Sequence, residues 1–117
     1  MNILIVEDSK PVTLVISRVV KEAGHDCLFA ANGEMALRLF RQRDVDMVFV
    51  DVELPGIDGY EVVREVRRSS PQTPVIMVSG HQKEESRRQA LEAGANEFLN
   101  KPVPPSRLQQ LLAQYLG

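Results

Sequence analysis

The sequence predicts an α/β fold in which five strands alternate with five helices, (βα)5. Five short apolar runs alternate with longer segments whose apolar residues recur at helical spacing, the pattern of a parallel sheet covered by helices. The apolar runs are mostly continuous, as expected when both faces of the sheet are covered. We therefore expect a three-layer, doubly wound sandwich around a five-stranded parallel sheet.

The expected strands are short, and the middle three, the second to the fourth along the chain, are expected to be the most buried. They cover residues 3–6, 27–30, 47–50, 75–78 and 97–99. Each begins or ends next to Gly, Pro, Asp or another polar residue, which limits its length.

The expected helices have recognisable ends and apolar faces. Asn32 is a cap for the second helix, and Pro105 suits the start of the fifth. Gly24 ends the first helix, and Gly94 ends the fourth, which runs over roughly residues 83–93. The residues expected on the buried faces of helices one to five are Val12, Val15, Ile16, Val19 and Val20; Ala36, Leu37 and Phe40; Val62, Val63 and Val66; Ala90 and Leu91; and Leu108, Leu111, Leu112 and Leu116.

The composition fits a single domain, residues 1–117, with 44% hydrophobic residues to form its core. A net charge of −2 does not indicate the basic surface of an autonomous nucleic-acid binder, so we expect no direct nucleic-acid partner. Cys27 cannot form an internal disulfide and is expected to be a small buried hydrophobe. The amino terminus does not resemble a signal peptide and no stretch is long enough to span a bilayer, so we expect a cytoplasmic location and no membrane partner.

Polar groups stand where four of the five expected strands end. Glu7 and Asp8 follow the first strand, Asp51 the third, Ser79 the fourth and Lys101 closely follows the fifth. Parallel strands bring their carboxyl ends to one edge of the sheet, and three carboxylates gathered there repel one another unless a positive group joins them. Oxygen ligands favour Mg²⁺, and Asp51 beside that cation could attack phosphorus as a nucleophile to give an acyl phosphate.

Four segments carry a family resemblance. They are residues 3–8 (ILIVED), 48–59 (VFVDVELPGIDG), 78–80 (VSG) and 98–102 (FLNKP). Together they resemble the receiver domain of bacterial two-component response regulators, the flavodoxin-like family of the chemotaxis response regulator, over essentially the whole chain. The resemblance implies a strand order of 2-1-3-4-5. It also implies a signalling protein that takes a phosphoryl group from a histidine kinase or a histidine phosphotransfer protein and catalyses only its own phosphorylation and dephosphorylation.

The resemblance assigns roles to the strand-end residues. Asp51 is the implied phosphoacceptor. Glu7 and Asp8 are the implied acidic pair that holds Mg²⁺ together with Asp51, and the backbone carbonyl of Glu53 is a further ligand. Lys101 is implied to pair with the phosphoryl oxygens.

The resemblance also implies a switch. Ser79 stands where the family places a hydroxyl that bonds the phosphoryl group, and Phe98 stands where an aromatic ring turns inward as that hydroxyl moves. The Lys101–Pro102 bond resembles a cis peptide of the family. At the positions that tune phosphoryl lifetime, this chain has Glu53 and His81, and we expect both to alter the dephosphorylation rate.

The resemblance implies that the readout surface is the face of the fourth helix, fifth strand and fifth helix. It supports a homodimer or binds an output domain or partner, and it carries Arg87, Glu97, Arg107 and Gln110. The sequence leaves open whether the chain is a complete single-domain regulator or a receiver cut from a longer protein with a DNA-binding or enzymatic output.

Other interpretations of the same residues remain. Taken singly, Asp8 or Ser9 could cap the first helix, Ser79 could cap the fourth, and Lys101 could be a solvated loop charge. Asp51-Val52-Glu53 faintly resembles the Asp-x-Asp motif of haloacid-dehalogenase-type Mg²⁺ phosphohydrolases, although that motif normally opens the chain and contains a second Asp. A third alternative is a pseudo-receiver that binds partners without accepting phosphate.

Overall fold

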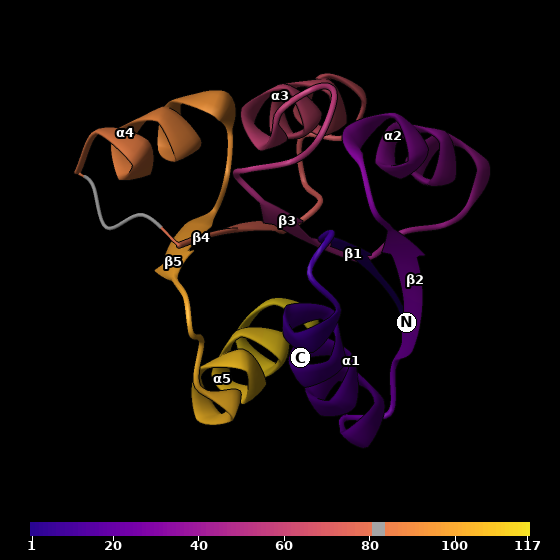
Figure 1. Cartoon of the computed structure of the whole chain (residues 1–117). Coiled ribbons are helices and arrows are strands. Elements are labelled where there is room, and N and C mark those ends of the chain that lie inside the picture. The colour runs from indigo at the N-terminus through magenta and orange to yellow at the C-terminus, as the bar shows by residue number, and fades with distance from the viewer. Residues whose placement is uncertain (81–83) are drawn as a thin grey trace.

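Over the residues that it describes, 1–80 and 84–117, the computed structural model contains five strands and five helices in alternation (Figure 1). In chain order the elements are β1 (Asn2–Val6), α1 (Lys10–Glu22), β2 (Asp26–Ala30), α2 (Gly33–Gln42), β3 (Met47–Asp51), α3 (Gly59–Ser69), β4 (Val75–Ser79), α4 (Glu84–Ala93), β5 (Glu97–Asn100) and α5 (Pro105–Leu116). The predicted (βα)5 fold is confirmed.

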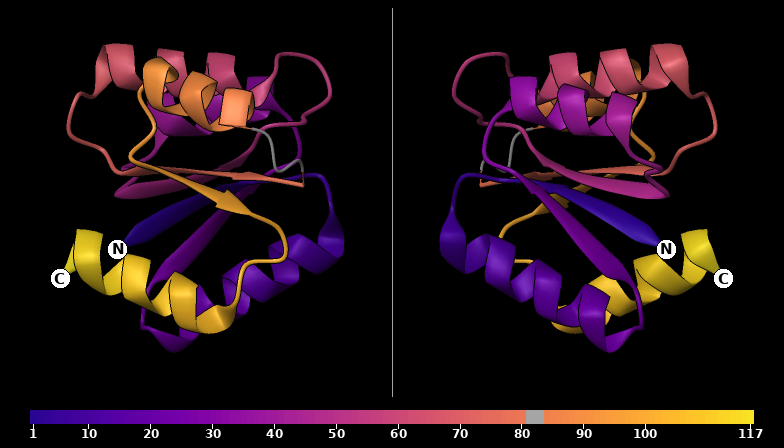
Figure 2. Two further views of the ribbon diagram at one scale, coloured as in Figure 1. Left: turned by 90° about the vertical axis from the view of Figure 1, so that its left-hand side faces the viewer. Right: turned by 90° about the vertical axis from the view of Figure 1, so that its right-hand side faces the viewer.

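The strands form one parallel sheet in the order β2-β1-β3-β4-β5, as the family resemblance implied. Figure 2 shows the sheet edge-on between its two helical layers. This order places β1 beside β3 and β3 beside β4, so the ends of these three strands are neighbours. The groups that follow them are therefore brought together at one rim.

Side chains on successive strand positions point to opposite faces and enter two separate cores. Leu4 and Val6 pack on the face covered by α2, α3 and α4. Ile3 and Ile5 pack on the face covered by α1 and α5. Both faces of the central strands are therefore shielded from solvent, which explains their unbroken apolar runs.

The second strand is an exception to the predicted burial. β2 lies at the edge of the sheet and pairs only with β1, so the side chain of Phe29 is 45% exposed and Cys27 is only half-buried. The three most buried strands are β1, β3 and β4, and the expectation that the second strand belongs among them was wrong.

Two predicted helix contacts were also wrong. Val15 is 44% exposed because it faces an open groove between α1 and the segment that follows β5. Leu91 is 46% exposed because α4 makes its buried contacts through Ala90 and Ala93.

The helix signals in the sequence are otherwise confirmed. The side chain of Asn32 accepts a hydrogen bond from the Met35 amide at 2.8 Å, and α5 begins at Pro105. The predicted start of the fourth helix at residue 83 lies outside the described residues. None of the helices in the described part of the chain is long and apolar enough to cross a membrane.

Candidate functional site

The carboxyl ends of β1 and β3 bring three carboxylates together. One oxygen from each of Glu7, Asp8 and Asp51 lies within 4.8 Å of the others. Glu7 and Asp51 are buried and Asp8 is exposed. The cluster therefore has two carboxylates anchored in the protein and one that faces solvent.

Lys101 is the cation of this rim. Its Nζ lies 2.9 Å from Glu7 Oε1 and 3.3 Å from Asp51 Oδ2. The backbone amide of Lys101 donates to the carbonyl of Ser79 at 2.8 Å, which fixes the end of β5 against the end of β4. The Lys101–Pro102 peptide is cis, as predicted. The alternative in which Lys101 is a solvated loop charge is contradicted by both ion pairs.

The pKa of Asp51 is raised from its ordinary 3.8 to about 7. Burial is the main cause and the charge of Glu7 adds to it, while Lys101 and the amide of Glu53 act in the opposite direction. Burial works to lower the pKa of Lys101, but its hydrogen bonds and attraction to Glu7 and Asp51 outweigh burial and raise it. Among the described residues, three carboxylates of the rim face one lysine.

This donor set fits a hard divalent cation. All the ligating atoms are carboxylate oxygens, the ligands that Mg²⁺ prefers, and Asp8 leaves a side open to water. A cation there would offset the repulsion between Asp51 and Glu7. The residues present therefore suit the metal that the sequence predicts.

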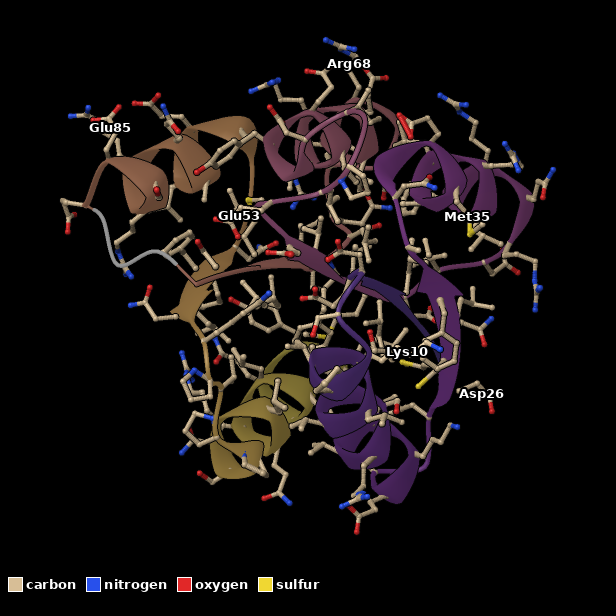
Figure 3. The ribbon with its side chains drawn as sticks, in the orientation of Figure 1. Lys10, Asp26, Met35, Glu53, Arg68 and Glu85 are labelled. Carbon is tan, nitrogen blue, oxygen red and sulfur yellow. The ribbon has the colours of Figure 1, made fainter. Side chains whose placement is uncertain are left out.

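Glu53 makes hydrogen bonds to both Asp51 and Ser79, which its position in the sequence did not reveal. Its backbone amide donates to Asp51 Oδ1 at 3.3 Å, and its side-chain Oε1 accepts a hydrogen bond from the Ser79 hydroxyl at 3.2 Å. Ser79 is fully buried, whereas Glu53 is exposed at the rim. Figure 3 shows Glu53 close to the sheet, while Arg68 and Glu85 project from the outer faces of α3 and α4. The alternative in which Ser79 caps α4 depends on residues 81–83, which lie outside the described part of the chain.

Ser79 and Phe98 lie on the same face of the sheet. Met77 packs in the core under α2, α3 and α4, and Ser79 follows it by two positions along β4. Phe98 pairs with Met77 in register and is 6% exposed in the same core. The two predicted switch residues are therefore neighbours of one buried side chain, with the ring turned inward.

The loop after Asp51 is held from two directions. A Cβ at Gly59 would lie 2.1 Å from the backbone oxygen of Asp51, so only glycine allows α3 to begin this close to β3. On the other side, the Glu34 side chain accepts a hydrogen bond from the amide of Ile57 at 3.0 Å. The sequence analysis missed Glu34, because nothing in the sequence pattern pairs the first turn of α2 with this loop.

Two further expectations have different outcomes. Ser9 is the N-cap residue of α1, but its side chain makes no capping bond, and its amide donates instead to Glu7 Oε2 at 3.1 Å. His81, predicted to tune phosphoryl lifetime, lies outside the described residues.

The fold and the acidic rim define a flavodoxin-like receiver architecture. The chain belongs to the response regulator receiver domain family, whose sequence model matches residues 3–113.

Curated relatives agree with this assignment. The chain is 38% identical over 114 residues to the transcriptional regulatory protein TcrA of Mycobacterium tuberculosis, covering 97% of this chain and 44% of the relative. It is 34% identical over 109 residues to the phosphate regulon transcriptional regulatory protein PhoB of Pseudomonas aeruginosa, covering 92% of this chain and 48% of the relative. The chain thus spans less than half the length of these relatives.

Solved structures agree as well. A putative response regulator from Chloroflexus aurantiacus superposes with a TM-score of 0.92 at 33% identity, covering 98% of this chain and 96% of that one. The BeF3-activated receiver domain of DrrB superposes with a TM-score of 0.91 at 29% identity, again covering 98% and 96%.

Proposed function

We propose that this receiver domain accepts a phosphoryl group on Asp51 from a histidine kinase or a histidine phosphotransfer protein and passes the signal on by a change of shape. The observation that carries the proposal is the grouping of Asp51 with Glu7 and Asp8 within 4.8 Å, with Lys101 3.3 Å from the Asp51 carboxylate. A scaffold has no need of three carboxylates at this spacing.

Each residue of the rim has a chemical task. Glu7, Asp8, Asp51 and the backbone carbonyl of Glu53 would hold Mg²⁺, which supplies charge neutralisation for an incoming phosphate. A carboxylate oxygen of Asp51 forms the new bond to phosphorus as the bond from phosphorus to the donor imidazole nitrogen breaks, and the electron pair stays on that nitrogen. Lys101 pairs with a phosphoryl oxygen throughout.

The response to phosphorylation takes place on the face of the sheet that α2, α3 and α4 cover. The buried hydroxyl of Ser79 moves to bond a phosphoryl oxygen, and the Phe98 ring, already buried in the core with Met77, repacks in response. Because both side chains are buried on the same face of the sheet, we expect movement of the first to change the packing of the second.

The phosphoryl donor needs a surface next to Asp51, and the structure offers an apolar groove there. The groove has a volume of about 660 Å³, runs between α1 and the segment after β5, and includes Lys101 in its lining. Its apolar wall is made by Pro11, Val12, Val15, Ile16, Pro102, Val103, Pro104 and Pro105. A helix of the donor bound in this groove would lie beside Lys101, whose Nζ contacts the Asp51 carboxylate.

The readout surface is proposed to be the face of α4, β5 and α5, as a homodimer or as the contact with an output domain or partner. Glu97 is engaged within this face, because Arg107 lies 3.4 Å from it and the Tyr115 hydroxyl donates to it at 2.6 Å. A partner that uses Glu97 must compete with these contacts. The cytoplasmic location and the single-domain extent of the chain stay predictions.

Incubation with Mg²⁺ and acetyl phosphate, followed by intact-mass measurement, tests the proposal. We expect one phosphate adduct on the wild type and none on Asp51→Asn. A haloacid-dehalogenase-type phosphohydrolase would instead release phosphate continuously without an accumulating adduct, and a pseudo-receiver would show neither. The hypothesis that Glu53 and His81 tune phosphoryl lifetime requires adduct decay to change in Glu53→Ala and His81→Ala, and unchanged decay in both would contradict it.

A further inference from the structure

The side chain of Glu53 accepts the hydrogen bond of the Ser79 hydroxyl, which the proposed switch needs for the phosphoryl group. Ser79 Oγ donates to Glu53 Oε1 at 3.2 Å in the unphosphorylated protein. A hydroxyl has one proton to donate, so Ser79 cannot keep this bond and also donate to a phosphoryl oxygen. The two acceptors compete for one donor.

We propose that the Glu53 carboxylate is a latch, which holds Ser79 in its unphosphorylated position and is released when a phosphoryl group arrives on Asp51. The proposal rests on the proposed function and adds to it a residue that sets the resting state. It is distinct from an effect of Glu53 on the attacking water, because it acts through Ser79 and before dephosphorylation begins.

Burial makes the contact important for the resting state. Ser79 is fully buried, so the loss of its hydrogen bond to Glu53 is not made good by water, and removing the Glu53 carboxylate destabilises the resting position more than the phosphorylated one. The exposed position of Glu53 lets its carboxylate swing into solvent when it is displaced.

The negative charge of the phosphoryl group would break the hydrogen bond between Glu53 and Ser79. The Glu53 amide donates to Asp51 Oδ1, so the backbone of Glu53 is fixed beside the acceptor carboxylate. A phosphoryl group on Asp51 brings roughly two negative charges near the Glu53 carboxylate and repels it. The same event therefore frees the Ser79 proton and supplies a stronger acceptor for it.

Binding of beryllofluoride with Mg²⁺, a phosphoryl mimic, measured by titration calorimetry tests the latch. We expect Glu53→Ala to bind the mimic roughly fivefold more tightly than the wild type, the size of one net hydrogen bond, and Glu53→Gln to fall between the two because its amide oxygen still accepts from Ser79. Glu22→Ala, which removes an exposed carboxylate at the far end of α1, is the matched control and should stay within about twofold of the wild type.

A double-mutant cycle separates the latch from simple charge repulsion. In a Ser79→Ala background, Glu53→Ala should raise the affinity by a smaller factor than in the wild type, because the latch has lost its donor and only the charge repulsion is relieved. An equal gain in both backgrounds, or no gain in Glu53→Ala while the wild type binds, would overturn the latch and leave the proposed function standing. Failure of the wild type itself to bind the mimic and to form an adduct would instead overturn the proposed function.

The contact can also be tested without metal or mimic. In Mg²⁺-free protein, the ¹³C resonance of the Glu53 carboxyl carbon, assigned by its loss in Glu53→Gln, should shift when Ser79 is replaced by Ala. An unmoved resonance would contradict the hydrogen bond on which the latch depends.

Discussion

At the scale of single residues, Asp51 is a carboxylate that the fold buries beside Glu7, with Lys101 as the facing cation. Its pKa of about 7 lies above the ordinary 3.8, so the folded protein binds more protons than the unfolded chain between these values. The contribution of Asp51 to stability therefore falls as the pH rises from about 4 to about 7.

Asp51→Asn should remove this pH dependence. Without Mg²⁺ at pH 8, we expect the variant to have a free energy of unfolding higher than the wild type by roughly 1–3 kcal/mol, less than the full shift because Lys101 also loses a charged partner. Near pH 4 the difference should nearly vanish. Urea unfolding at both pH values measures it, with the exposed Asp44→Asn as control, and a difference independent of pH would contradict the argument.

Tyr115 is a second residue with a shifted ionisation. Burial, the hydrogen bond to Glu97 and the charge of Glu97 raise the pKa of Tyr115 to about 12, against a smaller opposing effect of Arg107. In a Tyr60→Phe protein, which keeps one tyrosine, absorbance at high pH should report an ionisation near pH 12. Glu97→Gln should move that midpoint toward the ordinary 10, and an unmoved midpoint would show that burial alone is responsible.

At the scale of elements, Arg67 joins the end of α3 to the turn between α4 and β5. Its guanidinium donates to the carbonyls of Gly94, Ser70 and Thr73 at 2.7–3.0 Å and to Asn96 Oδ1 at 3.0 Å. A lysine has one nitrogen and cannot reproduce this fork. The contact therefore depends on arginine specifically.

Arg67→Lys should lower the free energy of unfolding by roughly 2 kcal/mol, because several carbonyls lose their donors together. Arg64, one turn earlier, makes an exposed ion pair with Glu61, and Arg64→Lys should change stability by less than about 0.5 kcal/mol. Denaturant unfolding of the two variants gives the comparison. Equal effects would mean that the fork contributes no more than a surface charge.

Sequence patterns predicted burial well for strands that are covered on both faces of the sheet, and less well for residues at the edge of the sheet or beside a groove. The runs that became β1, β3 and β4 are apolar throughout and lie within one residue of their predicted bounds. Phe29 and Val15 look equally apolar in the sequence, but one lies on an edge strand and the other beside a groove. Local sequence does not encode which neighbours an element receives.

The same limit applies to the site. The strand-end groups were predictable because parallel strands necessarily bring them to one rim. The Glu53–Ser79 bond, the Glu34–Ile57 bond and the Arg67 fork join residues that lie 23 to 29 positions apart or are fixed by loop geometry. No periodicity marks such pairs, so they appeared only in the folded chain.

At the scale of the whole molecule, the acidic rim links cation binding to global stability. A ligand that binds only the folded state, present at ten times its dissociation constant, raises the free energy of unfolding by about 1.4 kcal/mol. We expect Mg²⁺ to do so for the wild type. Asp8→Asn, which alters an exposed side chain and leaves the core intact, should lose most of this gain, whereas Asp44→Asn should keep it. Equal stabilisation of all three proteins would place the cation elsewhere.

The Arg67 fork also decides how α4 can be displaced. The carbonyl of Gly94, just after this helix, accepts two hydrogen bonds from the Arg67 guanidinium, whereas the carbonyl of Ser86 in its first turn accepts one from the Tyr60 hydroxyl at 3.4 Å. The helix is therefore more firmly held at its Gly94 end than at its first turn. If phosphorylation moves α4, we therefore expect a smaller movement at Gly94 than at the amino-terminal turn of the helix.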